Sequence, residues 1–388
     1  MIKSSSLFTQ VLSLINRNKF ARDVHFLQAE RQAKGFRCWE QLVAMLFAQL
    51  GGANSLREIC GGLATSAGKL SHLGVTRLPN KSTLAYANEH RPWQLYEKTF
   101  YHLFEQAAAL AGQKKRRFRF KNPLRSLDSS TIDLCLSMYD WAKFRRTKGA
   151  VKLHLMLDHR GCLPCWARIT NGKVHDVKPA RSIQFEAETV LAVDRGYIDY
   201  ELFDSWTKQR VWFVTRTKNN MAYRIVESRD VPTRGPVLRD EVIELIGQSS
   251  SEKCPHLLRR VEIWDDSKKC ELAFLTNNMK FAASTVAAIY KERWQIELFF
   301  KALKQNLKIK SFVGTSENAV KIQIWTAVIC MLLLKILKLR ASFDWSLSNL
   351  AAMLRMNLLT YRDLWCWLDK PYQTAVIVPP WQQPLLFD

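Results

Sequence analysis

The chain has 388 residues, of which 47% are hydrophobic and 24% charged, as in globular proteins large enough for two or three domains. Lys and Arg number 58 against 35 Asp and Glu, a formal net charge of +23 that favours a polyanionic partner, nucleic acid before an anionic membrane surface. The nine cysteines are odd in number and scattered from Cys38 to Cys366, which argues against a secreted, disulfide-bonded scaffold.

No segment predicts insertion into a membrane. The longest uncharged apolar run, residues 322–334, lies between Lys321 and Lys335 and is too short to cross a bilayer, so it predicts a buried core helix. The N-terminal residues lack the long apolar region and small-residue cleavage site of a secretory signal. We therefore expect no membrane association and a cytoplasmic location.

Residues 7–112 predict an all-α N-terminal domain, which we bound at 1–115. Apolar residues recur there at spacings of three and four, and Pro92 and Gly112 suit the start and the end of a helix. A short capped helix is predicted just before Pro92. This pair of helices is compatible with a helix-turn-helix that reads DNA and equally with a plain bundle; DNA binding is our prediction for the domain.

A basic stretch, KKRRFRFKNPLR at 114–125, follows the helices. Its charges and two interleaved phenylalanines favour a linker that grips phosphates, so a domain boundary is predicted here.

The hydrophobic period then changes to that of strands. Residues 123–132 and 189–193 predict strands that each end near an acid, and 151–170 predict a hairpin around the turn Asp-His-Arg-Gly. Cys162 and Cys165 form a C-x-x-C within this hairpin, but no second pair follows at zinc-finger spacing, which favours buried thiols. A helix at 200–209 and a strand at 211–218 complete the series.

Residues from about 219 to 280 predict further strands separated by QSSSEK as a loop. A long helix that carries residues 290–304 follows, with Ser284 as its predicted N-cap. Residues 341–388 predict a helical C-terminal extension. Of its two possible roles, an outer layer of the core is favoured over a dimer contact.

The long helix has two faces of different chemistry. With successive residues about 100° apart, five polar side chains fall within roughly 80° of one another, opposite a fully apolar face. A solvated face with i,i+4 pairs is the usual explanation of such a stripe; the alternative is a surface that grips an anion around one acid. The polar residues are Tyr290, Arg293, Glu297, Lys301 and Lys304.

Two other acids stand where apolar strands end. Asp128 and Asp194 would be held on rigid backbone and still reach solvent, as a metal ligand requires, although acids also start turns at such places. With Glu297 they could supply three hard oxygen donors for Mg²⁺ and so serve phosphoryl transfer.

The spacing Tyr290-x2-Arg293-x3-Glu297-x6-Lys304, together with DRGY and FVTRTK, resembles the signature of bacterial DDE transposases of the insertion-sequence family numbered four. The resemblance implies an RNase H-like catalytic domain over 120–340, interrupted by a β-rich insertion at about 219–280. It implies a catalytic triad that binds two Mg²⁺ ions, for which Mn²⁺ can substitute. The triad residues are Asp128, Asp194 and Glu297, and the implied DNA-binding residues are Tyr290, Arg293, Lys301, Lys304, Arg216 and Lys218.

The function implied is that of a DNA transposase acting as a homodimer on paired double-stranded ends, at the bacterial nucleoid. It would bind the terminal inverted repeats of its element, cleave at the ends and transfer the 3′-OH ends to target DNA. Two alternatives are an RNase H-like nuclease without strand transfer and a non-catalytic DNA-binding protein descended from a transposase. The three intact acids argue against the second alternative.

Two further places bear on this function. Relatives that form a DNA hairpin carry a tryptophan that receives a flipped base, at the place where this chain has Leu272. Trp264 is the nearest tryptophan that could take this role, but a place in the core accounts for Trp264 at least as well. His175 and Asp176 are predicted on a loop between a strand and a helix, where a place near the acids is the less favoured interpretation.

Overall fold

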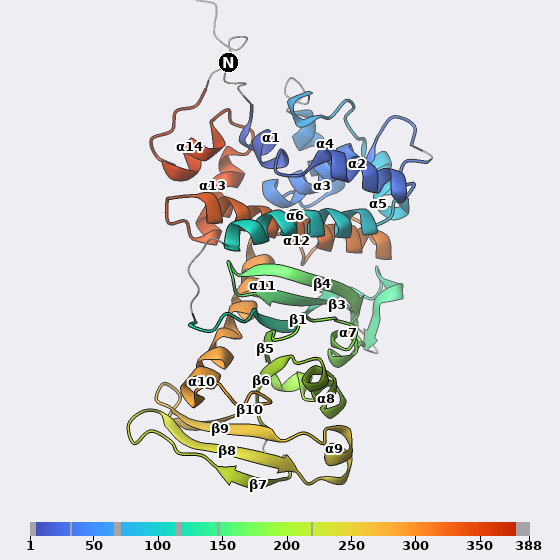
Figure 1. Cartoon of the computed structure of the whole chain (residues 1–388). Coiled ribbons are helices and arrows are strands. Elements are labelled where there is room, and N and C mark those ends of the chain that lie inside the picture. The colour runs from blue at the N-terminus through green and yellow to red at the C-terminus, as the bar shows by residue number, and fades with distance from the viewer. Residues whose placement is uncertain are drawn as a thin grey trace, which may run out of the picture. The chain divides into compact units, whose positions relative to one another are not determined.

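The structure, a computed structural model, describes residues 5–31, 33–65, 71–112, 118–145, 148–218 and 220–377. It is a mixed α/β protein with a ten-stranded sheet (Figure 1). The chain forms two compact units. Unit 1 comprises Met1–Lys114, Ile132–Gly149 and Lys301–Asp388, and unit 2 comprises Lys115–Thr131 and Ala150–Phe300.

Unit 1 is built around one buried helix, α12 (Glu317–Arg340), which packs against α3, α5, α6 and α13. Among the described residues it is the one helix long and apolar enough for a membrane, yet 89% of its most apolar window is buried inside the protein. This confirms the predicted core helix. The other helices of unit 1 are α1 (Leu7–Leu12), α2 (Arg17–Phe26), α3 (Cys38–Gly51), α4 (Leu56–Ala64), α5 (Lys81–His90), α6 (Gln94–Gly112), α13 (Leu347–Asn357) and α14 (Leu364–Asp369).

The helix predicted before Pro92 is α5, and local chemistry sets its start. The Asn80 side chain accepts a hydrogen bond from the Thr83 amide at 2.7 Å, which satisfies one of the free donors of the first turn. The next helix, α6, begins two residues after Pro92 and ends at Gly112, as its sequence predicts.

Unit 2 carries most of the sheet. The strands run in the order β4-β3-β1-β5-β6-β10-β9-β8-β7, with β2 also pairing with β3. β1 pairs with β5 and β5 with β6 in parallel, whereas β3 and β4 form the predicted antiparallel hairpin. The strands are β1 (Leu124–Leu134), β2 (Lys143–Arg145), β3 (Lys148–Asp158), β4 (Leu163–Asn171), β5 (Val190–Val193), β6 (Trp212–Arg216), β7 (Tyr223–Ser228), β8 (Val237–Leu245), β9 (Leu258–Asp265) and β10 (Cys270–Thr276).

Both faces of this sheet are covered. Alternate residues of β5 belong to different cores: Leu191 and Val193 pack with α7 (Val177–Ala180) and α8 (Tyr200–Lys208), while Val190 and Ala192 pack with α10 (Ala283–Glu292). A parallel strand that is buried on both faces needs apolar residues at successive positions, which explains the uninterrupted apolar run in the sequence. The acid that follows β5 is therefore held by a rigid three-layer core.

The structure corrects three local predictions. QSSSEK is the helix α9 (Gln248–Lys253), and because it buries none of its residues, it has no apolar period to reveal it. The long helix is two helices, α10 and α11 (Trp294–Asn306), joined at Arg293. The N-cap of α10 is Ala282, without a side-chain hydrogen bond, so the prediction of Ser284 is wrong.

The predicted insertion does contain strands, and they continue the main sheet because β10 pairs with β6. The predicted range 120–340 does not form one compact unit, since Ile132–Gly149 and the residues from Lys301 cluster with the N-terminal helices.

Within the basic stretch, Phe118 and Phe120 stack and pack on the core through Phe281. The linker residues 113–117 lie outside the described residues.

The core around α12 gives a first prediction. Trp325 is 1% exposed and lies 5.4 Å from the ring of Phe100, and its indole N–H has no hydrogen-bond partner within the described part of the chain. Trp325→Ala should lower the free energy of unfolding by about 3–5 kcal/mol through loss of contacts and cavity formation. Trp325→Phe should lose less than half as much, because it keeps the ring and removes the unsatisfied donor. Urea denaturation measures both; equal losses would contradict this account.

Candidate active site

Strand pairing brings Asp128 and Asp194 together. In the parallel register of β1 and β5, Leu127 lies opposite Val193, and each is followed by its acid. The Asp194 carboxylate accepts a hydrogen bond from the Gly196 amide at 2.7 Å. A Cβ at Gly196 would lie 2.9 Å from Oδ1 of Asp194, so a larger residue would displace this carboxylate. The two acids thus share one edge of the sheet on fixed backbone.

Glu297 reaches this edge through Arg293. Nη2 of Arg293 donates to Oε1 of Glu297 at 2.6 Å, and Nη1 lies 3.9 Å from Oδ2 of Asp128. Burial opposes the charge on Arg293, but the hydrogen bond to Glu297 and the nearby Tyr290 and Asp128 outweigh it and raise the pKa of the guanidinium. Arg293 therefore acts as the counter-charge between the helix acid and the strand acid.

The electrostatics of Asp128 show an excess of negative charge. Burial raises the pKa of Asp128 to about 7, and Asp194 and Glu297 add to the rise against the opposing Ser129 amide and Arg293. A buried carboxyl with like charges nearby favours its neutral form unless a cation compensates. The acidic charge around Asp128 therefore favours the binding of a cation.

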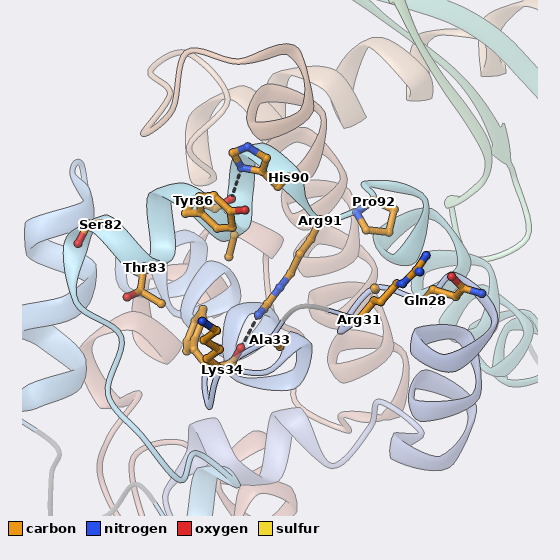
Figure 2. A pocket seen from close by; sticks show the side chains of 13 residues that line it. Gln28, Arg31, Ala33, Lys34, Ser82, Thr83, Tyr86, His90, Arg91 and Pro92 are labelled. Atoms are coloured by element: carbon orange, nitrogen blue, oxygen red, sulfur yellow. Dashed lines mark hydrogen bonds between the residues drawn. The ribbon is translucent and has the colours of Figure 1, made fainter.

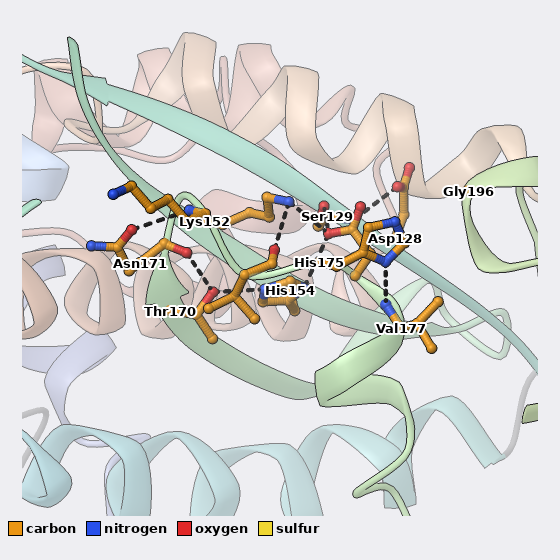
Figure 3. A network of polar contacts seen from close by, with 12 residues as sticks. Asp128, Ser129, Lys152, His154, Thr170, Asn171, His175, Val177 and Gly196 are labelled. Carbon is orange, nitrogen blue, oxygen red and sulfur yellow. Dashed lines mark hydrogen bonds and ion pairs between the residues drawn. The ribbon is translucent and has the colours of Figure 1, made fainter. Parts of the chain in front are cut away.

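A polar network supports Asp128 from behind (Figure 3). Asp176 accepts hydrogen bonds from Oγ of Ser129 at 2.7 Å and from Nζ of Lys152 at 3.0 Å. Nδ1 of His154 lies 3.6 Å from the same carboxylate oxygen, and its Nε2 pairs with Oγ1 of Thr170 at 2.9 Å. The network fixes the residue next to Asp128.

The other predicted site residues fall into two groups. The Tyr290 ring lies 5.6 Å from the guanidinium carbon of Arg293 and packs 5.0 Å from Phe274, whose strand partner is Arg216. Lys218 is exposed two residues beyond β6, and Lys301 and Lys304 follow Glu297 along α11, Lys301 exposed and Lys304 half-buried. Lys218 and Lys301 make no ion pair with the three acids in the part of the chain that the structure describes.

Sequence reasoning undervalued Asp176 and missed Tyr197. The structure connects Asp176 to Ser129, against the prediction that favoured a place away from the acids. The hydroxyl of Tyr197 is buried without a hydrogen-bond partner among the described residues, and burial, together with Asp128, Asp176 and Asp194, raises its pKa well above the usual range. Its place three residues after Asp194, in DRGY, was the available signal.

The structure also decides between the two accounts of Trp264. This side chain is 37% exposed and donates to Asp266 at 3.1 Å, so a core role is wrong, whereas Leu272 is buried.

A closed metal cluster is not formed by the described residues, since no three of their His, Cys, Asp and Glu side chains are close enough to share an ion. Asp128 lies within β1 and not at its end as predicted, and Asp194 follows β5; the two acids nevertheless meet where the parallel pairing of these strands ends. Acids brought together in a strongly basic chain are typical of enzymes that transfer phosphoryl groups in nucleic acids.

Comparison with known proteins agrees with this class. Residues 119–333 match the family described as Transposase DDE domain, and the chain belongs to this family. It is a DNA transposase of the bacterial DDE type, a metal-dependent enzyme that cleaves DNA. A second family, described as a domain of unknown function, matches residues 3–76.

The similar proteins are named as transposases. The Sinorhizobium fredii protein y4zB, named as a transposase, is 33% identical over 288 residues, 72% of this chain and 78% of its own. A Geobacillus stearothermophilus protein, named as a transposase for the insertion sequence element IS5377, is 33% identical over 226 residues, 58% of this chain and 59% of its own. A piggyBac transposase synaptic complex with hairpin DNA aligns at a TM-score of 0.44 and 12% identity, covering 91% of this chain and 79% of that one.

The network behind Asp128 gives a second prediction. Asp176→Asn should lower DNA cleavage about tenfold and raise the magnesium concentration for half-maximal activity, because partners that orient a metal ligand cost 10–100-fold when lost. The matched control is Asp133→Asn, five residues beyond Asp128 on the same strand and exposed. An unchanged magnesium requirement in Asp176→Asn would contradict a positioning role.

His154 gives a third prediction. Its side chain is 1% exposed, and burial lowers its pKa from 6.5 to about 4. Between these values the unfolded chain binds the proton and the native chain does not, so stability falls as the pH falls. Relative to His154→Gln, the wild type should lose about 2 kcal/mol between pH 7.5 and pH 5.0. Urea denaturation at both pH values measures this, and a constant difference would refute it.

Proposed function

We propose that the chain binds the terminal inverted repeats of its own insertion sequence, cleaves at the element ends and transfers the freed 3′-OH ends to target DNA. The observation that carries the proposal is the register of β1 and β5, which sets Asp128 beside Asp194 with Arg293 leading to Glu297. These three acids are the proposed catalytic triad, and the name of the Geobacillus stearothermophilus relative, a transposase for an insertion sequence element, supports the choice of substrate.

The proposed catalytic fold is RNase H-like. The order β4-β3-β1-β5-β6, with β1, β5 and β6 parallel and a hairpin at one side, supports it. The proposed division of labour follows the sequence: an all-α N-terminal domain over 1–115 that binds DNA, a catalytic domain over 120–340 with its β-rich insertion at about 219–280, and a helical extension over 341–388. The membership of the chain in insertion-sequence family four rests on the signature at 290–304.

The donors fit a divalent cation in their chemistry. Three carboxylates supply the oxygen ligands that Mg²⁺ prefers, and the raised pKa of Asp128 marks a place where a cation would offset like charges. Asp128, Asp194 and Glu297 would hold two Mg²⁺ ions, or Mn²⁺ in their place, once Arg293 releases Glu297. Such ions activate the attacking oxygen and stabilise the leaving oxygen at a phosphodiester.

The cationic side chains of the site would position the DNA backbone. Arg293, half-buried beside Tyr290, would exchange its hydrogen bond to Glu297 for one to a phosphate oxygen. Arg216, Lys218, Lys301 and Lys304 would hold the strand on either side. We further propose a homodimer on paired ends, at work on the nucleoid in the cytoplasm.

The test is magnesium-dependent cleavage of linear DNA that carries the terminal repeats. Glu297→Gln should lower cleavage at least about a hundredfold, because even outer-shell partners of a metal ligand cost 10–100-fold. DNA affinity should be retained, since the substitution removes a negative charge. Undiminished cleavage would remove Glu297 from the triad.

The matched control is Glu271→Gln, an exposed acid of β10 that should leave cleavage unchanged. With labelled ends, joining of the 3′-OH to a second duplex separates a transposase from a nuclease that only hydrolyses. Hydrolysis without any joining would contradict the proposed strand transfer.

A further inference from the structure

Unit 1 contains an open groove of about 1080 Å³ that the proposed chemistry does not use (Figure 2). One wall is the segment that follows α2, and the other is α5 with the turn after it. The residues drawn around it in Figure 2 include Gln28, Arg31, Lys34, Ser82, Thr83, Tyr86, His90 and Arg91.

Among its described lining residues, the groove has cations and no acid. Arg31, Lys34 and Arg91 contribute positive charge, and His90 adds a titratable ring. None of the three cations forms an ion pair with a carboxylate in the part of the chain that the structure describes. The guanidinium of Arg91 is held by the carbonyl of Phe36 and, at 3.2 Å, by Oε1 of Gln41, so its position is fixed before any ligand arrives.

A second cavity, of about 820 Å³, extends the same basic surface. It shares Gln28 and Arg31 with the groove and adds Arg17, His25 and Arg37. Its one acid, Glu30, uses its carboxylate to accept a hydrogen bond from the Cys38 amide at 2.5 Å, so its charge is tied to the start of α3.

The outer face of α5 supplies the other contacts that a nucleic-acid backbone uses. Lys81 and Ser82 are exposed at its first turn. Tyr86 is 58% exposed and stacks on His90 with ring centroids 4.0 Å apart. Hydroxyl, amide and cationic groups beside an exposed aromatic pair are the groups that contact DNA phosphates and sugars.

We propose that this groove binds the sugar–phosphate backbone of duplex DNA, with α5 against one strand. The inference rests on the proposed function only for the identity of its ligand, DNA, and it uses none of the catalytic acids. An unpaired cationic surface favours an extended polyanion over a small anion, because each neutralised phosphate releases counterions. Arg31 and Lys34 lie within residues 3–76, a segment matched as a domain of unknown function, so the groove gives the DNA binding proposed for the N-terminal domain a definite surface.

The experiment measures binding of the full chain to a fluorescent duplex in EDTA, so that no cleavage occurs. Arg31→Ala/Lys34→Ala should weaken the Kd about tenfold and reduce the slope of log Kd against log salt by about 2, since each lost phosphate contact removes about 0.9. The loss should be equal for terminal-repeat and unrelated duplexes, because backbone contacts carry no sequence information.

Ser82→Glu provides a second variant that should fold. A carboxylate in the first turn of a helix is favourable, so weaker binding by this variant cannot be attributed to loss of α5. The matched control is Lys338→Ala/Lys370→Ala, which removes two exposed charges elsewhere in unit 1. Equal weakening by the control, or unchanged binding by both groove variants, would overturn the assignment.

This result is independent of the catalytic test. If the groove variants bind normally while Glu297→Gln loses cleavage, only the groove assignment fails. If Glu297→Gln cleaves normally while the groove variants lose affinity, only the proposed triad fails.

Discussion

The parallel pairing of β1 with β5 is the constraint on which the site depends. A register that sets Leu127 opposite Val193 leaves the two following acids on neighbouring strands, and a slip of one residue would turn one carboxylate to the other face. The register is fixed by cores on both faces of β5, where alternate residues pack against different helices. The chemistry therefore relies on ordinary apolar packing to hold two like charges together.

Holding these charges together destabilises the native state, and the surrounding residues show how this is offset. Burial and the nearby acids raise the pKa of Asp128, whereas the Ser129 amide and Arg293 act in the opposite direction. Behind them, Lys152 and the hydroxyl of Ser129 satisfy Asp176, so a third carboxylate can lie close without adding an unpaired charge. Such compensation by fixed hydrogen bonds and counter-charges is how a preorganised site tolerates its own repulsion.

The sequence predicted the features that a periodic apolar pattern or a break in such a pattern marks. The apolar face opposite Glu297 is buried as its spacing requires, and Asp194 directly follows β5 as predicted, whereas Asp128 lies within β1 and not at its end. Features set by tertiary contact were not predictable: α9 buries nothing and has no period, and the connection between Asp176 and Ser129 joins residues 47 positions apart. Arg293 was predicted as a DNA contact from the resemblance, but only the structure reveals it as the link between Asp128 and Glu297.

The net charge of +23 is not equally available to a DNA partner over the whole chain. In the strands β8 and β9 the cations are already paired: Arg259 donates to both oxygens of Asp240, at 2.7 and 2.6 Å, and is 3% exposed, and Arg260 binds Glu241 and Glu262. Such arginines stabilise the sheet, and a phosphate could recruit them only at the cost of leaving buried acids unpaired. Arg31 and Lys34 have no such partner among the described residues and are exposed, so their charge is free to exchange counterions for phosphates. Electrostatic affinity for DNA therefore depends on where the cations lack carboxylate partners, and not on the total charge.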